Sequence, residues 1–153
     1  MIREAAAADC GAIQGLYEIL CPGEPIGVLA GRIEQIRQDQ NSLLLVVEEH
    51  GTVQATAFLT ICLDPMLGQR PYAVLENIVV APGRRGQGLG TALMEHVELV
   101  CRERNCSKMM LLSSSRRTGA HRFFSRLGYS DTVSKGFKKY LGEGPPAGPA
   151  AER

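Results

Sequence analysis

A glycine-rich segment between an expected strand and an expected helix is the part of this sequence in which residue types and spacing predict chemistry. Residues 84–91 read Arg-Arg-Gly-Gln-Gly-Leu-Gly-Thr. Glycine lets a backbone approach an anion closely, and the first N–H groups of a helix lack acceptors and lie at the positive end of its dipole. The segment therefore predicts a phosphate-binding cradle, which Arg84 and Arg85 would strengthen. The alternative is an exposed turn with no ligand.

The glycine spacing excludes two common phosphate-binding motifs. A P-loop would need GxxxxGK[ST], which the chain lacks. A dinucleotide fingerprint would need GxGxxG at the start of a βαβ unit, whereas the glycines here are spaced GxGxG. We therefore expect a phosphate-bearing ligand other than a nucleoside triphosphate or NAD.

Two motifs resemble those of the GNAT superfamily of acetyl-CoA-dependent N-acetyltransferases. Residues 85–90, Arg-Gly-Gln-Gly-Leu-Gly, follow Val80-Ala-Pro82, and residues 120–129 read Ala-His-Arg-Phe-Phe-Ser-Arg-Leu-Gly-Tyr. The resemblance extends over residues 2–141 and implies acetyl-CoA as cosubstrate, with no metal. It implies contacts to the cofactor from Ile78, Val79, Val80, Arg85, Gly86, Gln87, Gly88, Leu89, Gly90, Thr91 and Phe124.

Acetyl transfer to an amine needs a group that removes a proton, because a primary amine with a pKa of about 10 is mostly protonated at neutral pH. Glu76 is our candidate base, since it precedes Ile78 by two residues on the expected strand. We expect it to be partly buried. A solvated or structurally paired Glu76 is the alternative, because alternation along 72–80 does not reveal which face meets the cleft.

The proton donor to the departing thiolate is less clearly marked. Phe124 stands where many members of the family carry tyrosine, and a phenyl ring cannot donate a proton. Tyr129 is our candidate in its place, with Ser113 and Ser125 as alternatives. A main-chain N–H near Val79 would stabilise the oxyanion. His121 is expected to be structural.

Hydrophobic periodicity and turn signals predict an α+β fold: a mixed, partly antiparallel central sheet flanked by helices, in the order β-α-α-β-β-β-α-β-α-β-β. Asp9 is expected to cap the first helix. The strands are expected at 2–5, 43–49, 52–63, 72–80, 108–113, 129–133 and 137–141, and the later helices at 28–39, 88–104 and 118–127. Residues 1–141 would form a single domain, and the Gly- and Pro-rich tail 142–153 would be disordered.

Composition narrows the possible partners. The 153 residues carry 17 Lys+Arg against 16 Asp+Glu, a formal net charge of +1, which disfavours nucleic acid as a partner. The apolar runs are far shorter than the roughly 20 residues that span a bilayer, so we expect no membrane as a partner. Charged residues at positions 3, 4 and 9 disfavour a secretory signal and favour a cytoplasmic location. The cysteines and histidines show no metal-ligand spacing.

The sequence thus predicts an N-acetyltransferase that moves acetyl from acetyl-CoA to a primary amine, most simply on a small molecule, by direct attack on the thioester. The alternatives are a protein N-terminal or lysine acetyltransferase and a non-catalytic acyl-CoA-binding module. A homodimer is possible through the expected terminal hairpin at 129–141.

Overall fold

The computed structural model describes residues 1–142, and its contacts divide the chain into two compact units. The first unit comprises residues 1–22 and 26–112, and the second comprises residues 23–25 and the chain from Ser113 onward. The single domain expected over residues 1–141 stays a prediction. Of the tail that we expect to be disordered, residues 143–153 lie outside the described part.

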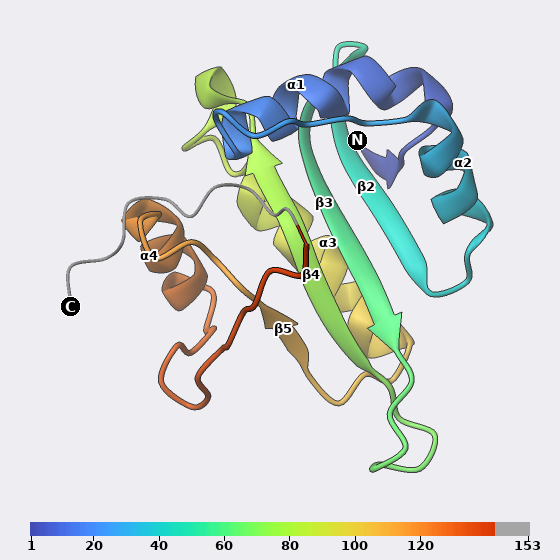
Figure 1. Ribbon diagram of the computed structural model, residues 1–153, viewed down its shortest axis with the longest axis vertical. Coiled ribbons are helices and arrows are strands. Elements are labelled where there is room, and N and C mark those ends of the chain that lie inside the picture. Colours follow the sequence, from blue (N-terminus) through green and yellow to red (C-terminus); the bar gives the residue numbers. More distant parts are fainter. Residues whose placement is uncertain (143–153) are drawn as a thin grey trace. The chain divides into compact units, whose positions relative to one another are not determined.

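The first unit contains a sheet of five strands in sequence order (Figure 1). β1 pairs with β2, β2 with β3 and β3 with β4, all antiparallel, whereas β4 and β5 are parallel. The strands are β1 (Ile2–Glu4), β2 (Ser42–Glu49), β3 (Thr52–Cys62), β4 (Tyr72–Val80) and β5 (Met109–Leu111). The expected mixed, partly antiparallel sheet is confirmed.

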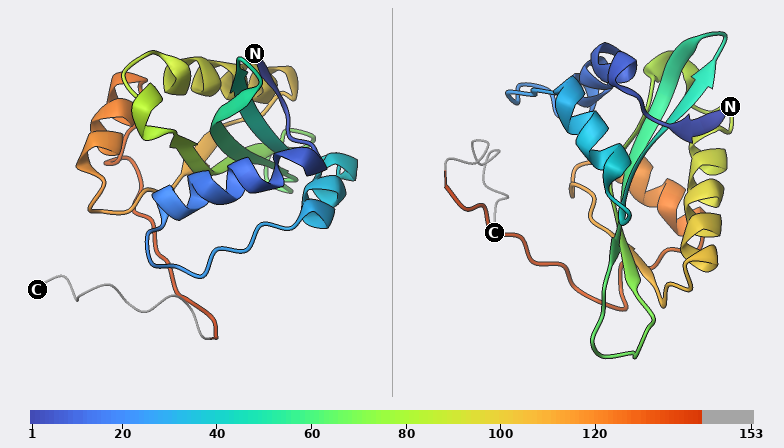
Figure 2. Two further views of the ribbon diagram at one scale, coloured as in Figure 1. Left: turned by 90° about the horizontal axis from the view of Figure 1, so that it is seen from above. Right: turned by 90° about the vertical axis from the view of Figure 1, so that its right-hand side faces the viewer.

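Helices cover both faces of this sheet (Figure 2). α1 (Cys10–Leu20) and α2 (Ala30–Gln38) lie on one face, and α3 (Leu89–Glu103) lies on the other. On the α1–α2 face the core includes Ile13, Ile33, Leu44 and Val46, which are nearly inaccessible to solvent. On the opposite face, the buried stripe of α3 at Leu93, Met94 and Val97 matches the helical period of that sequence.

The turn between β2 and β3 explains why that hairpin is visible in sequence. His50 and Gly51 both have positive φ, 50° and 74°. Two central residues with positive φ form the hairpin turn whose twist matches that of the flanking strands. The two-residue turn therefore fixes the first pairs of the hairpin, Glu49 with Thr52 and Glu48 with Val53, before the register shifts by one residue between Glu48 and Val47.

The prediction of two closing strands at 129–133 and 137–141 is wrong. No strand occurs between Tyr129 and Gly142, and Val133, Phe137 and Leu141 are each more than four-fifths exposed. Apolar residues at strand-like spacing form a strand only when a neighbouring strand supplies hydrogen bonds and buries one face. The hairpin edge from which we inferred a homodimer is therefore absent from the described residues.

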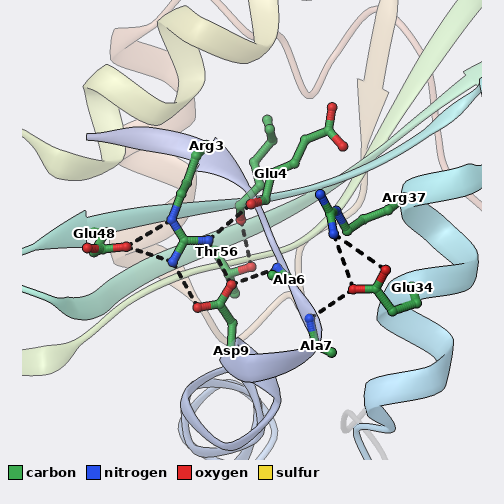
Figure 3. A network of polar contacts seen from close by, with 10 residues as sticks. Arg3, Glu4, Ala6, Ala7, Asp9, Glu34, Arg37, Glu48 and Thr56 are labelled. Atoms are coloured by element: carbon green, nitrogen blue, oxygen red, sulfur yellow. Dashed lines mark hydrogen bonds and ion pairs between the residues drawn. The ribbon is translucent and has the colours of Figure 1, made fainter.

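An ion-pair network joins the start of the chain to β2 and to the turn before α1 (Figure 3). Arg3 donates to both carboxylate oxygens of Asp9, at 2.8 and 2.9 Å, and to Glu48, at 2.7 and 2.8 Å. Asp9 also accepts the N–H of Ala6 at 2.7 Å. The expectation that Asp9 caps the first helix is wrong, because its side chain makes no cap bond to α1. Its oxygens are used by Arg3 and Ala6 instead.

Asp9→Asn should destabilise the protein in a pH-dependent manner. The hydrogen bond from Arg3 holds the pKa of Asp9 below its usual range, against the opposing effect of burial. A lowered folded-state pKa gives stability that is complete above the unfolded pKa of about 3.9 and is lost as the pH falls through the folded value. We expect the variant to lose about 1–2 kcal/mol of unfolding free energy at pH 7. This difference should shrink below pH 4.

Urea unfolding of both proteins between pH 7 and pH 3 measures this difference. Asp64→Asn is the matched control, because Asp64 accepts only the local N–H of Met66 in its loop (2.9 Å) and asparagine keeps that oxygen. Two results would contradict the role given to Arg3 and Asp9. In the first, Asp9→Asn loses no more unfolding free energy at pH 7 than Asp64→Asn does. In the second, the loss of unfolding free energy in Asp9→Asn does not change with pH.

Candidate active site

β4 loses its neighbour on one edge halfway along its length. β5 pairs only with Ala73, Val74 and Leu75. Among the residues that the structure describes, no strand pairs with the same edge of β4 from Glu76 to Val80. The main-chain groups that face this edge are therefore available to another extended backbone or to an amide-bearing ligand.

β4 is also irregular on its other edge, against β3. Phe58 pairs with Glu76 and Thr56 pairs with Val79, so that one residue of β3 faces two residues of β4, Asn77 and Ile78. This two-against-one count is a β-bulge. Asn77 has a φ of 53°, in the left-handed region that asparagine tolerates better than most residues. The bulge changes the side-chain alternation of β4 at Asn77.

The main-chain groups of Val79 and Val80 point to opposite edges. The N–H of Ala81 donates to the carbonyl of Gln54 in β3 at 2.8 Å, and successive residues of a strand alternate in direction. Val79 therefore faces β3, whereas Ile78 and Val80 face the open edge. The carbonyl of Val80 accepts a hydrogen bond from Nε of Arg85 at 3.1 Å.

The glycine-rich segment follows β4 directly and leads into α3. After a short 3-10 turn (Pro82–Arg84), Gly86 and Gly88 adopt φ values of 72° and 84°. α3 begins at Leu89, and its first turn includes Gly90 and Thr91. An added Cβ at Gly86 or Gly88 would meet nothing within 4 Å, so both glycines border open space. The local structure therefore fits the phosphate cradle expected from the sequence.

The side chains of this segment are partly committed to protein contacts. Arg84 forms an ion pair with Glu49 at the end of β2. Gln87 donates its side-chain N–H to the carbonyl of Gly83 at 3.2 Å. Main-chain N–H groups are consequently the principal donors toward a ligand, with Arg85 as the nearby cation.

A cavity of about 550 Å³ lies between the sheet and the α1–α2 pair. Its walls combine apolar residues with polar ones, among them Arg32, Asp39 and Asn77 of the β4 bulge. The lining comprises Ile13, Tyr17, Gly27, Val28, Leu29, Arg32, Ile33, Gln35, Ile36, Asp39, Ser42, Leu44, Phe58 and Asn77. A concave, mostly apolar pocket with a few polar groups is typical of a small-molecule site.

One wall of the cavity is held in place by Gln14 of α1. Its side-chain oxygen accepts the N–H of Val28 at 2.8 Å, and its side-chain nitrogen donates to the carbonyl of Ile26 at 3.0 Å. The thiol of Cys10 contacts the carbonyl of Val28 at 3.2 Å. These contacts attach the irregular segment before α2 to the exposed side of α1, where helical periodicity alone gives no reason to expect a partner.

Glu76 lies on the cavity side of the sheet but does not line the cavity. Its cross-strand partner Phe58 is a lining residue, and paired residues project from the same face. The side chain of Glu76 is exposed, so the expected partial burial is not observed. The β4 backbone places it beside the open edge.

Phe124 and Tyr129 belong to the second unit, where α4 (Thr118–Arg126) ends in a left-handed Gly128 with a φ of 90°. The N–H of Tyr129 donates to the carbonyl of Phe124 at 3.1 Å, and their rings meet edge to face with centroids 6.2 Å apart. This is the Schellman ending of a helix with its accompanying apolar contact. Nε2 of His121 lies 2.8 Å from the carbonyl of Ser114, which gives His121 a structural contact.

Within residues 1–142, no helix is long and apolar enough to cross a membrane. The same part of the chain contains no cluster of three or more His, Cys, Asp or Glu side chains that could hold a metal ion.

Comparison with known proteins identifies the family. Residues 13–129 match the model of the acetyltransferase (GNAT) family. The chain is also 32% identical, over 82% of its length, to an amino-acid acetyltransferase of Pseudomonas putida strain KT2440. This chain belongs to the GNAT acetyltransferase family, as its two motifs predicted. It spans about a quarter, 27%, of the length of that curated relative.

Solved structures show the same fold. A protein of Agrobacterium tumefaciens strain C58 assigned to the acetyltransferases is 28% identical, with a TM-score of 0.84, covering 92% of this chain and 99% of its own. The structure of AAC(6')-Iy in complex with the bisubstrate analogue CoA-S-monomethyl-acetylneamine is 24% identical, with a TM-score of 0.76, covering 93% and 98%. The fold is therefore shared over nearly the full length of each chain.

Gly88→Ala should weaken CoA binding. A Cβ at a φ of 84° costs about 1–2 kcal/mol in an L-residue, so the turn must change shape or bear the strain. We expect the dissociation constant for CoA, measured by calorimetry, to rise about tenfold.

Gly83→Ala is the control for this experiment. Gly83 does not have a positive φ, and an added Cβ there would also meet nothing within 4 Å. Equal binding by wild type and Gly88→Ala, or an equal loss in both variants, would show that the left-handed turn does not form the phosphate cradle.

Proposed function

We propose that this protein is an N-acetyltransferase that moves an acetyl group from acetyl-CoA to a primary amine on a small molecule. The observation that carries the proposal is the continuity of three features: an open edge of β4, a left-handed glycine turn, and the N-terminus of α3. Membership of the GNAT family supports the reaction class. The cavity of about 550 Å³ beside the same strand, with its mixed apolar and polar lining, supports a small acceptor.

The chain's residues fit acetyl-CoA in two places. Main-chain N–H groups from Arg85 to Thr91 would bind the pyrophosphate, aided by the dipole of α3. The main-chain groups of Ile78 and Val80 that face the open edge would pair with the amides of the pantetheine arm, as an added strand would. When bound, acetyl-CoA supplies an acetyl group activated as a thioester.

Around the thioester, the open edge provides a hydrogen-bond donor and Glu76 provides a base. An N–H next to Val79, at Val80 or Ile78, can donate to the carbonyl oxygen, while that of Val79 itself faces β3. Glu76, exposed beside this edge, would accept the amine proton, directly or through water.

For the leaving thiolate, Tyr129 remains our candidate proton donor, with Ser113 and Ser125 as alternatives. Phe124, which stands where other members carry tyrosine, would pack against the cofactor. A thiolate with a solution pKa of about 8.5 is also a tolerable leaving group without an acid.

Thiol release from acetyl-CoA in the presence of an amine panel and a peptide panel tests the proposed function. We expect release with small primary amines and little with peptides. Release with peptides alone would assign the acceptor to a protein N-terminus or lysine. CoA binding without release for any acceptor would favour a non-catalytic acyl-CoA-binding module and contradict the proposal.

Glu76→Gln tests the base in the same assay. We expect kcat to fall about 100-fold near neutral pH, within the usual range for general base catalysis, and the loss to narrow at high pH as the free amine accumulates. Glu95→Gln, an exposed position on α3, is the matched control and should retain wild-type turnover. Unchanged turnover in Glu76→Gln would exclude Glu76 as the base.

A further inference from the structure

In the described part of the chain, Arg32 and Asp39 are the charged residues that line the cavity between the sheet and the α1–α2 pair. Both are exposed, so they lie where the cavity opens to solvent. Arg32 belongs to α2, and Asp39 follows the last residue of that helix. The two residues are about two helical turns apart, and no ion pair joins them. The cavity therefore presents a cation and an anion that do not neutralise each other.

Asp39 has a contact within the chain. Its Oδ1 accepts the main-chain N–H of Asn41 at 2.7 Å. A carboxylate that accepts the N–H two residues further on stabilises a turn, and this turn leads from α2 into β2. The carboxylate of Asp39 thus has a structural task.

Arg32 has no comparable contact. Within residues 1–142, no hydrogen bond or ion pair links its guanidinium to another residue. A carboxylate three or four positions away along the helix could pair with it, but those positions hold Val28, Leu29, Gln35 and Ile36. All four of these residues line the same cavity. Arg32 therefore projects from a part of the cavity wall that offers it no anion.

The other arginine of α2, Arg37, does have an anionic partner. It donates to both carboxylate oxygens of Glu34, at 3.3 and 3.4 Å, and Glu34 also accepts the N–H of Ala7 at 3.1 Å (Figure 3). Neither Arg37 nor Glu34 lines the cavity. The helix thus pairs the cation outside the cavity and leaves the cation at the cavity without an anion.

We propose that Arg32 binds an anionic group, a carboxylate or a phosphate, on the acceptor amine. This inference rests on the proposed function and deepens it, because it names the class of acceptor. A guanidinium presents a planar fork of N–H donors that matches two oxygens of either anionic group. With the anion at Arg32, the amine reaches across the cavity toward Glu76 and the open edge of β4.

The spacing of the strands decides how far apart the anion and the amine must be. α2 packs on β2, whereas Glu76 and the open edge belong to β4, two strands further along the sheet. Neighbouring strands lie about 4.8 Å apart, so β2 and β4 are separated by about 10 Å. A methylene chain together with the Arg32 side chain spans this distance. The carboxylate probe is therefore 5-aminopentanoate, and pentylamine, in which a methyl group replaces the carboxylate, is its neutral match.

Thiol release from acetyl-CoA measures the preference for the anionic amine. We expect kcat/KM of wild type to be about fivefold or more higher for 5-aminopentanoate than for pentylamine, because solvent at the cavity opening screens part of a bidentate pair. Arg32→Gln should remove most of this preference and change KM for acetyl-CoA less than about twofold. Arg37→Gln is the matched control, because it removes a cation of the same helix outside the cavity. It should keep the wild-type preference.

The dependence on salt is a readout that loss of packing would not produce. In wild type, added salt should raise KM for 5-aminopentanoate more than KM for pentylamine, and in Arg32→Gln the two should respond alike. A second pair, 3-aminopropyl phosphate and 3-aminopropan-1-ol, distinguishes the two anionic groups. The pair whose preference falls further in Arg32→Gln identifies the group that Arg32 binds.

Calorimetric binding separates this proposal from the proposed function. If either anionic amine binds wild type about fivefold more tightly than Arg32→Gln, the site stands even where no thiol is released. If thiol is released with neutral amines and Arg32→Gln keeps every wild-type preference, the acetyltransferase stands and the role of Arg32 is wrong. The proposal is overturned if neither anionic amine is preferred over its neutral match in turnover or binding. An equal loss in Arg32→Gln and Arg37→Gln would overturn it as well.

Discussion

The structure depends on the interruption of hydrogen bonding along β4. The strand is held on both edges up to Leu75, and beyond it the β5 edge is open while the β3 edge contains the bulge at Asn77. An unpaired strand inside a protein is costly unless something else satisfies its main chain. The open edge therefore favours an extended, amide-bearing ligand at this point, and the glycine turn that follows provides for the phosphates at the end of such a ligand.

The two sides of β4 have different proposed tasks, and the bulge connects them. In the proposed function, the open edge and the turn at Gly86 and Gly88 would bind the acetyl donor, and the cavity against α1 and α2 would bind the acceptor. Asn77 belongs to both, since its backbone makes the bulge and its side chain reaches the cavity. The long-range contacts of Arg3 and Gln14 fix the first strand and the cavity wall around this strand.

The sequence predicts the parts of this arrangement that depend on local pattern. Alternation of apolar and polar residues predicts strand 72–80, and turn residues predict the hairpin at His50. The helical period of apolar residues predicts the helix after Gly88. The bulge is not predicted, because it is a mismatch of register between two strands and Asn77 alone does not reveal it. The prediction of closing strands at 129–141 is wrong because, among the described residues, that segment has no neighbouring strand with which to form hydrogen bonds.

The most direct test of the central claim is backbone amide hydrogen exchange, followed residue by residue by NMR, with and without CoA. The amides of Ile78 and Val80 face the open edge, so they should exchange fast in the free protein and slowly in the complex. Val79, which faces β3, should be protected in both. If CoA binds but the amide exchange rates of Ile78 and Val80 stay unchanged, CoA does not lie along the open edge of β4. That result would contradict the proposed binding mode.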